Sequence, residues 1–91
     1  MRVVWTEAAL ADLEDVLAYI AEHYPSLAAP VERRLRAVIA RISRWPESGR
    51  AVEERPGVRV VPLVRFPYRL FYIVTAERVE ILHLRHAARD V

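Results

Sequence analysis

Hydrophobic side chains recur at spacings of three and four residues over two long stretches of the N-terminal half, a pattern typical of amphipathic helices. The first stretch follows Thr6, a good helix N-cap, and ends before Pro25. The second begins around Ala29 and Pro30, since proline fits the first turn of a helix. The two apolar stripes consist of Leu10, Leu13, Leu17, Ile20 and Tyr24, and of Val31, Leu35, Val38, Ile42 and Trp45. Because the link between them is short, the two helices are predicted to form an antiparallel hairpin.

The hydrophobic period changes to two after the turn signal at Pro56–Gly57. Val58–Val64 is rich in β-branched residues, but Pro62 cannot donate a backbone hydrogen bond, so this segment is predicted as an edge or bulged strand. Two further strands are predicted over Arg69–Thr75 and Arg78–Leu84, with a tight turn between them. The three strands together form an antiparallel meander.

A short apolar run at Val3–Trp5 predicts one more strand, which pairs with an edge of the meander. The polar stretch from Trp45 to Gly57 is interpreted as a connecting loop. The sequence therefore predicts a two-layer α+β fold in the order β-α-α-β-β-β, with the helical hairpin packed on an antiparallel sheet. At 91 residues the chain has room for a single domain, over residues 1–91.

Composition excludes several classes of site. The chain has no cysteine, so disulfides and thiolate metal sites are excluded. Its three histidines are scattered without metal-ligand spacing, and neither a metal nor a cofactor is predicted. We expect a soluble, cytoplasmic protein, because no stretch resembles a signal peptide or is apolar over the ~20 residues that span a bilayer.

Charge is distributed unevenly along the chain. All 14 basic residues are arginines, and the net charge is only +2. Residues 1–25 carry one arginine and five acids, whereas residues 26–91 carry thirteen arginines and seven acids. The arginines of the second predicted helix lie opposite its apolar stripe, where they are either simply solvated or bind a partner. This polarity suits an anionic partner, but the net excess is small for a protein that binds nucleic acid backbone.

Motifs spread over nearly the whole chain resemble the RelE/ParE superfamily of bacterial type II toxins. They are Trp5, Ala8-Ala9-x-x-Asp12-Leu13, Trp45-Pro46-x-x-Gly49-Arg50, Pro56-Gly57-Val58-Arg59, Pro67-Tyr68-Arg69-Leu70-Phe71-Tyr72 and His86-x-x-Arg89-Asp90. The resemblance implies the β-α-α-β-β-β fold. It also implies a cognate antitoxin that wraps the toxin with an extended or helical segment, forming a toxin–antitoxin hetero-oligomer.

Activities within that superfamily divide into two classes. Members similar to RelE cut messenger RNA on the ribosome, which would give this chain a catalytic set of Arg69, His86 and Arg89: an arginine to hold the phosphate, and a histidine for proton transfer. Members similar to ParE inhibit DNA gyrase without catalysis. Ribonuclease members of the superfamily typically have several lysines and a terminal segment that supplies a tyrosine or histidine after the last strand. This sequence has no lysine and shows no such segment, which favours the ParE-like activity. An unrelated small α+β interaction module is the third hypothesis.

Residues predicted to contact a partner are cationic or aromatic and lie on the second helix and the last two strands: Arg33, Arg41, Tyr68, Arg69, Tyr72 and Arg85. Each has a simpler interpretation. The two tyrosines either reach a partner or pack inside against Leu35 or Trp45. Arg69 either binds an anionic group or forms an exposed ion pair with Glu80, which would contribute little to stability.

The histidines of the last strand are also candidates for proton transfer. His83 alternates with Val79 and Ile81 and is therefore predicted to share their face of the sheet, which favours a partly buried histidine with its own hydrogen-bond partner. His86 follows the predicted strand and is the better candidate for a functional group.

Overall fold

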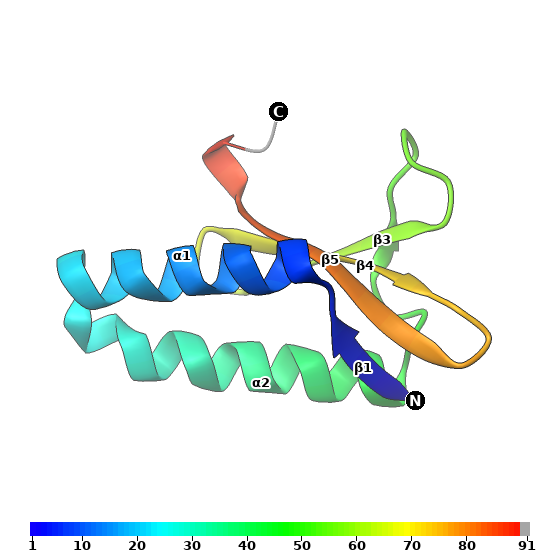
Figure 1. The fold of residues 1–91 in the computed structure, drawn as a ribbon, viewed down its shortest axis with the longest axis horizontal. Coiled ribbons are helices and arrows are strands. Elements are labelled where there is room, and N and C mark those ends of the chain that lie inside the picture. Colours follow the sequence, from blue (N-terminus) through cyan, green and yellow to red (C-terminus); the bar gives the residue numbers. More distant parts are fainter. Residues whose placement is uncertain (90–91) are drawn as a thin grey trace.

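Two helices of equal length form one layer of the computed structural model, which describes residues 1–89. Helix α1 spans Glu7–His23 and α2 spans Ala28–Arg44, and the short helix η1 at Pro25–Leu27 joins them. The helices lie side by side and antiparallel, as predicted (Figure 1). Oγ1 of Thr6 accepts a hydrogen bond from the backbone N–H of Ala9 at 3.2 Å, which confirms the predicted N-cap. No helix within residues 1–89 is long and apolar enough to cross a bilayer.

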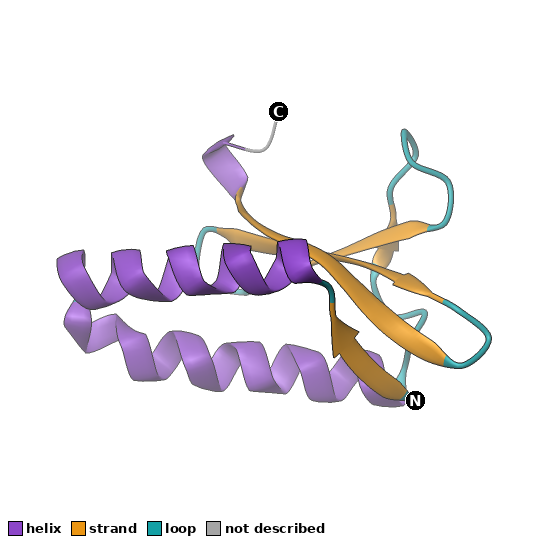
Figure 2. Ribbon diagram, viewed as in Figure 1, coloured by secondary structure: helices purple, strands orange, loops and turns teal. Residues whose placement is uncertain are grey.

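Five strands form the other layer (Figure 2). They are β1 at Arg2–Trp5, β2 at Arg50–Ala51, β3 at Val58–Pro62, β4 at Tyr68–Val74 and β5 at Arg78–His86, and they lie in the order β1-β5-β4-β3-β2. A short helix, η2, follows at Ala87–Arg89. The predicted α+β class, the two layers and the meander are confirmed.

Two details of the sheet differ from the prediction. The sheet is mixed, because β1 pairs with β5 in parallel. Helices of equal length bring the chain back beside its start, where the ammonium group of Met1 donates a hydrogen bond to the carbonyl of Ser43 at 2.8 Å. The meander then ends with β5 running in the direction of β1. In addition, the segment interpreted wholly as a loop contains β2, which pairs with Arg59 and Val60 of β3. Pro62 lies beyond the reach of β2 and pairs only with Arg69 of β4, so its missing N–H is not needed on the β2 side.

The core lies between the two helices and the sheet, and α1 contributes Ala9 and Ile20 to it. The predicted stripe of α2 is buried at Val31, Leu35, Val38 and Ile42, whereas Trp45 is 59% exposed. Trp45 caps the helix in a non-helical conformation, so it no longer follows the helical arc from which its burial was predicted. Burial of each large aliphatic side chain contributes about 1.5–3 kcal/mol to folding.

A bulge in the β4–β5 pair decides which side chains of β5 face the core. Phe71 lies opposite His83 but Tyr72 lies opposite Ile81, so the register skips Leu82. Leu84, at 3% exposure, therefore continues the buried row that Val79 and Ile81 begin. The prediction that His83 shares that row is wrong, because a period of two holds only where no extra residue is inserted.

Tyr72 holds the loop after α2 against the sheet. Its hydroxyl donates to the carbonyl of Pro46 and accepts from the N–H of Gly49, both at 2.8 Å. The guanidinium of Arg59 donates to the carbonyls of Glu47 and Gly49 at 3.2 and 2.8 Å. These bonds fix the path of the chain between α2 and β2, and so the position of Arg50.

Substitution Gly49→Ala is expected to lower the free energy of unfolding by about 1–3 kcal/mol, because overpacking forces neighbours to move. A Cβ at Gly49 would lie 2.5 Å from the hydroxyl oxygen of Tyr72. Urea unfolding measures the change. The neighbouring exposed substitution Ser48→Ala is the control and should stay within about 0.5 kcal/mol of the parent protein. Equal stability of the two variants would contradict this account of the loop.

Candidate functional site

Arg69 and Arg85 lie directly opposite each other on β4 and β5. Side chains opposite each other in an antiparallel pair project from the same face of the sheet. The side chain of Arg85 is exposed and that of Arg69 is partly exposed. Like charges at facing positions repel each other, and the two guanidinium groups give this part of the sheet a cationic character. The register thus brings together two of the residues that were predicted to contact a partner.

Arg50 adds a third arginine, which is not among the residues predicted to contact a partner. Arg50 and Arg69 line one open pocket of about 380 Å³, together with Ser48 and Pro62. Arg50 reaches this position through β2 and through the loop that Tyr72 fixes. The available sequence signal was its place at the end of the Trp-Pro-x-x-Gly-Arg motif, directly after a glycine that must pack without a side chain.

His86 lies on the other face of the sheet. It is opposite Tyr68, one register position from the arginine pair, and its ring meets the ring of Tyr68 edge to face with centroids 5.4 Å apart. Because successive side chains of a strand point to opposite faces, Arg69 and His86 are separated by the sheet. Arg69 and His86, two members of the predicted catalytic set, therefore do not lie together at one site. The side chain of the third, Arg89, lies outside the described part of the structure.

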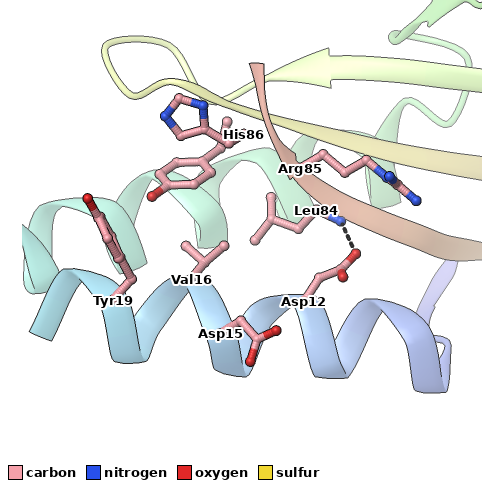
Figure 3. A pocket seen from close by; sticks show the side chains of 8 residues that line it. Asp12, Asp15, Val16, Tyr19, Leu84, Arg85 and His86 are labelled. Carbon is pink, nitrogen blue, oxygen red and sulfur yellow. Dashed lines mark hydrogen bonds between the residues drawn. The ribbon is translucent and has the colours of Figure 1, made fainter. Parts of the chain in front are cut away.

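A pocket of about 390 Å³ lies between α1 and the end of β5 (Figure 3). Asp12, Asp15 and Tyr19 line it from α1, and His86 from β5. Figure 3 shows His86 over the pocket, whereas the side chain of Arg85 extends in another direction. This pocket is therefore partly acidic and aromatic, and it is distinct in composition from the pocket at Arg50 and Arg69.

Asp12 joins α1 to the edge of β5. The pairing of β1 with β5 ends at Trp5 and Ile81. Beyond that point the carboxylate of Asp12 accepts a hydrogen bond from the N–H of Leu84 at 3.0 Å, and Nδ1 of His83 lies 3.0 Å from the same oxygen. The interpretation of His83 as a partly buried histidine with its own partner is confirmed, since a carboxylate oxygen is an acceptor that a ring N–H can meet.

The structure decides whether the two tyrosines pack inside the protein and whether Arg69 pairs with Glu80. Tyr68 and Tyr72 are 7% and 0% exposed, and both belong to the buried cluster that contains Leu35. Tyr72 has no exposed surface with which it could contact a partner. Its hydroxyl instead holds the loop after α2 through Pro46 and Gly49. The alternative that pairs Arg69 with Glu80 is wrong: Glu80 lies opposite Ile73 and accepts from Nε of Arg78 at 2.8 Å.

Arg33 and Arg41 lie on the exposed side of α2, away from its buried stripe. Arg33 lines a hollow that also includes Arg65 of the loop before β4. Arg41 lines a larger groove between α2 and β3, beside Arg44 and Trp45. The predicted partner-binding arginines thus belong to two regions, the outer side of α2 and the sheet.

Comparison with known proteins shows a match to the family described as the ParE toxin of the type II toxin–antitoxin system parDE, over residues 3–91. The chain belongs to this family. It is also 38% identical over 89 residues to Toxin RelE2 of Caulobacter vibrioides, an alignment that covers 97% of each chain. The resemblance to the RelE/ParE superfamily is confirmed, and the protein is a type II toxin of that superfamily.

Solved structures agree with the fold of this toxin. The chromosomal ParDE system from P. aeruginosa contains a chain with a TM-score of 0.79 and 25% identity, over 94% of the toxin and 95% of that chain. The YoeB/ParE toxin from Agrobacterium tumefaciens shares the fold at a TM-score of 0.64 and 17% identity, over 94% and 98% of the two chains.

Substitution Asp12→Ala is expected to lower the toxin's free energy of unfolding by about 1–3 kcal/mol, because it leaves a partly buried N–H of β5 without an acceptor. Asp12→Asn keeps an acceptor oxygen and should cost less. Asp15→Ala removes an exposed carboxylate from the same helix and should change stability by about 0.5 kcal/mol or less. Chemical unfolding of the three variants measures this order, and a larger effect at Asp15 than at Asp12 would refute it.

Proposed function

We propose that this toxin inhibits growth in the cytoplasm by binding DNA gyrase, without catalysing a reaction, and that a cognate antitoxin neutralises it. Membership in the ParE toxin family supports the class of target. The residues proposed for target contact are Arg69 and Arg85, with Arg50 beside them. These guanidinium groups can form bidentate hydrogen bonds with carboxylates of a protein partner.

The separation of Arg69 from His86 is the observation that carries the non-catalytic part of the proposal. Cleavage of RNA by its own 2′-hydroxyl requires a proton acceptor and a cation at the same phosphate. Arg69 shares its face with Arg85, whereas His86 contacts Tyr68 on the opposite face. The remaining histidine of β5, His83, is held by Asp12. This arrangement favours binding over proton transfer.

Purified toxin is expected to inhibit supercoiling by gyrase while leaving messenger RNA intact. Arg69→Ala and Arg85→Ala should each weaken inhibition by roughly 10-fold, since a hydrogen bond to a charged group contributes about 1.5–3 kcal/mol. A titration of toxin into a supercoiling assay measures the loss. Primer extension on messages from induced cells provides the second readout.

His86→Phe is the matched control, because a phenylalanine keeps the aromatic contact with Tyr68 and cannot transfer a proton. It should inhibit gyrase as well as the parent protein. Cuts within translated codons that disappear in both Arg69→Ala and His86→Phe, together with unimpaired gyrase, would instead establish the RelE-like ribonuclease activity.

A further inference from the structure

The pocket between α1 and the end of β5 carries a carboxylate that no side chain of the described part of the chain neutralises. Asp15 and Tyr19 lie four residues apart on α1 and line this pocket from one face of the helix. No basic side chain within residues 1–89 forms an ion pair with Asp15. Arg85 also lines the pocket, but its side chain extends in another direction (Figure 3). We call this space, lined by Asp15, Val16, Tyr19, Leu84 and His86, the α1 pocket.

Asp12, the second carboxylate of the α1 pocket, is already engaged. Its Oδ2 accepts a hydrogen bond from the N–H of Leu84 at 3.0 Å and lies 3.0 Å from Nδ1 of His83. Asp15 is exposed and is therefore the carboxylate available to a ligand. A metal ion does not suit this site, since residues 1–89 contain no group of three His, Cys, Asp or Glu side chains that could hold one.

Aromatic rings flank the available carboxylate. Tyr19 is 43% exposed, and its ring centroid lies 4.5 Å from that of His23 on the same helix. On the strand side of the pocket, the ring of His86 meets that of Tyr68 edge to face. The face of an aromatic ring attracts a cation, and a carboxylate beside it adds a charged hydrogen-bond acceptor. These groups together suit a guanidinium or ammonium group.

His86 contributes a ring to the α1 pocket and no positive charge. Its Nδ1 accepts a hydrogen bond from the backbone N–H of Ala88 at 3.1 Å. A ring nitrogen that accepts a hydrogen bond carries no proton, so the imidazole in this conformation is neutral and has its proton on Nε2. The side of the pocket that His86 forms therefore does not repel a cation.

We propose that the α1 pocket binds the guanidinium of one arginine side chain, which the toxin's protein target presents. The carboxylate of Asp15 accepts hydrogen bonds from it, and the rings of Tyr19 and His86 flank it. Arginine suits the site better than lysine, because its planar group stacks on rings, binds a carboxylate with two hydrogen bonds and is weakly hydrated. The volume of about 390 Å³ is near the lower end of the range of ligand pockets, about 300–1,000 Å³, and matches one side chain.

This site rests on the proposed function and adds a requirement on the target. Arg85 lines the α1 pocket and also lies opposite Arg69 on the sheet. A partner bound at the two arginines therefore reaches the pocket. It presents carboxylates to the arginine pair and, beside them, an arginine to Asp15. This mixed pattern of charge disfavours a uniformly anionic partner such as nucleic acid, because its phosphates would meet Asp15.

A titration of the full-length toxin with N-acetyl-arginine amide tests the pocket without the target. Two-dimensional NMR should show shifts of the backbone amides of Val16, Tyr19 and Leu84. The uncharged citrulline analogue should shift none of them at the same concentration. Asp15→Asn combined with Tyr19→Leu should weaken binding by roughly 10-fold, since it removes an exposed ion pair and a cation–π contact.

Glu14→Gln is the matched control, because Glu14 is an exposed carboxylate of the same helix that does not line the pocket. It should change the affinity by about 2-fold or less. Equal shifts from the citrulline analogue, or equal weakening by the control, would overturn the cation site. So would shifts of the same amides by magnesium chloride alone, because they would assign the pocket to a metal ion.

Supercoiling assays connect the α1 pocket to the target. The double variant should weaken inhibition of gyrase by roughly 10-fold, whereas Glu14→Gln should inhibit as the parent toxin does. A double variant that loses affinity for N-acetyl-arginine amide but inhibits gyrase normally would overturn the pocket as a target contact. If the parent toxin does not inhibit gyrase, the proposed function fails, while the titration still decides whether the pocket binds a guanidinium.

Discussion

The register of β4 against β5 is the constraint on which the functional surface depends. It places Arg69 opposite Arg85 and Tyr68 opposite His86, so that two arginines share one face while a histidine turns to the other. The extra residue at the bulge, Leu82, places Leu84 in the core. Beyond the end of β1, the carboxylate of Asp12 accepts a hydrogen bond from the backbone N–H of Leu84. A slip of one residue would exchange the two faces and place the arginines against the helices.

The acidic and basic side chains lie on different sides of the molecule because α1 carries carboxylates and α2 carries arginines. The carboxylate of Asp12 is engaged in joining α1 to β5, and the acidic side of α1 surrounds a pocket of mixed charge. Helix α2 buries its apolar stripe and turns three of its arginines, Arg34, Arg41 and Arg44, toward the groove beside β3. The small net charge of +2 thus conceals a strongly cationic surface on one side of the molecule. Association with an acidic partner is then steered toward that side.

The sequence predicted the helices and strands well. It predicted less well which side chains lie on the same face of the sheet. Helix limits followed from Thr6 and Pro25, and the meander followed from alternation, because both signals are local. The parallel pairing of β1, the burial of Tyr72 and the position of Arg50 depend on contacts between distant segments, which periodicity does not encode. His86 was misplaced for the same reason, since the predicted strand ended at Leu84 and β5 continues through His86 with its alternation intact.

Disulfide cross-linking tests the central claim most directly, because the chain contains no native cysteine. Facing Cα atoms in an antiparallel pair lie about 4.5–5.5 Å apart, within the range that a disulfide spans. The account predicts that cysteines replacing Arg69 and Arg85 form an intramolecular disulfide under mild oxidation, whereas cysteines replacing Arg69 and His86 do not. Cross-linking of the second pair in place of the first would contradict the assigned faces.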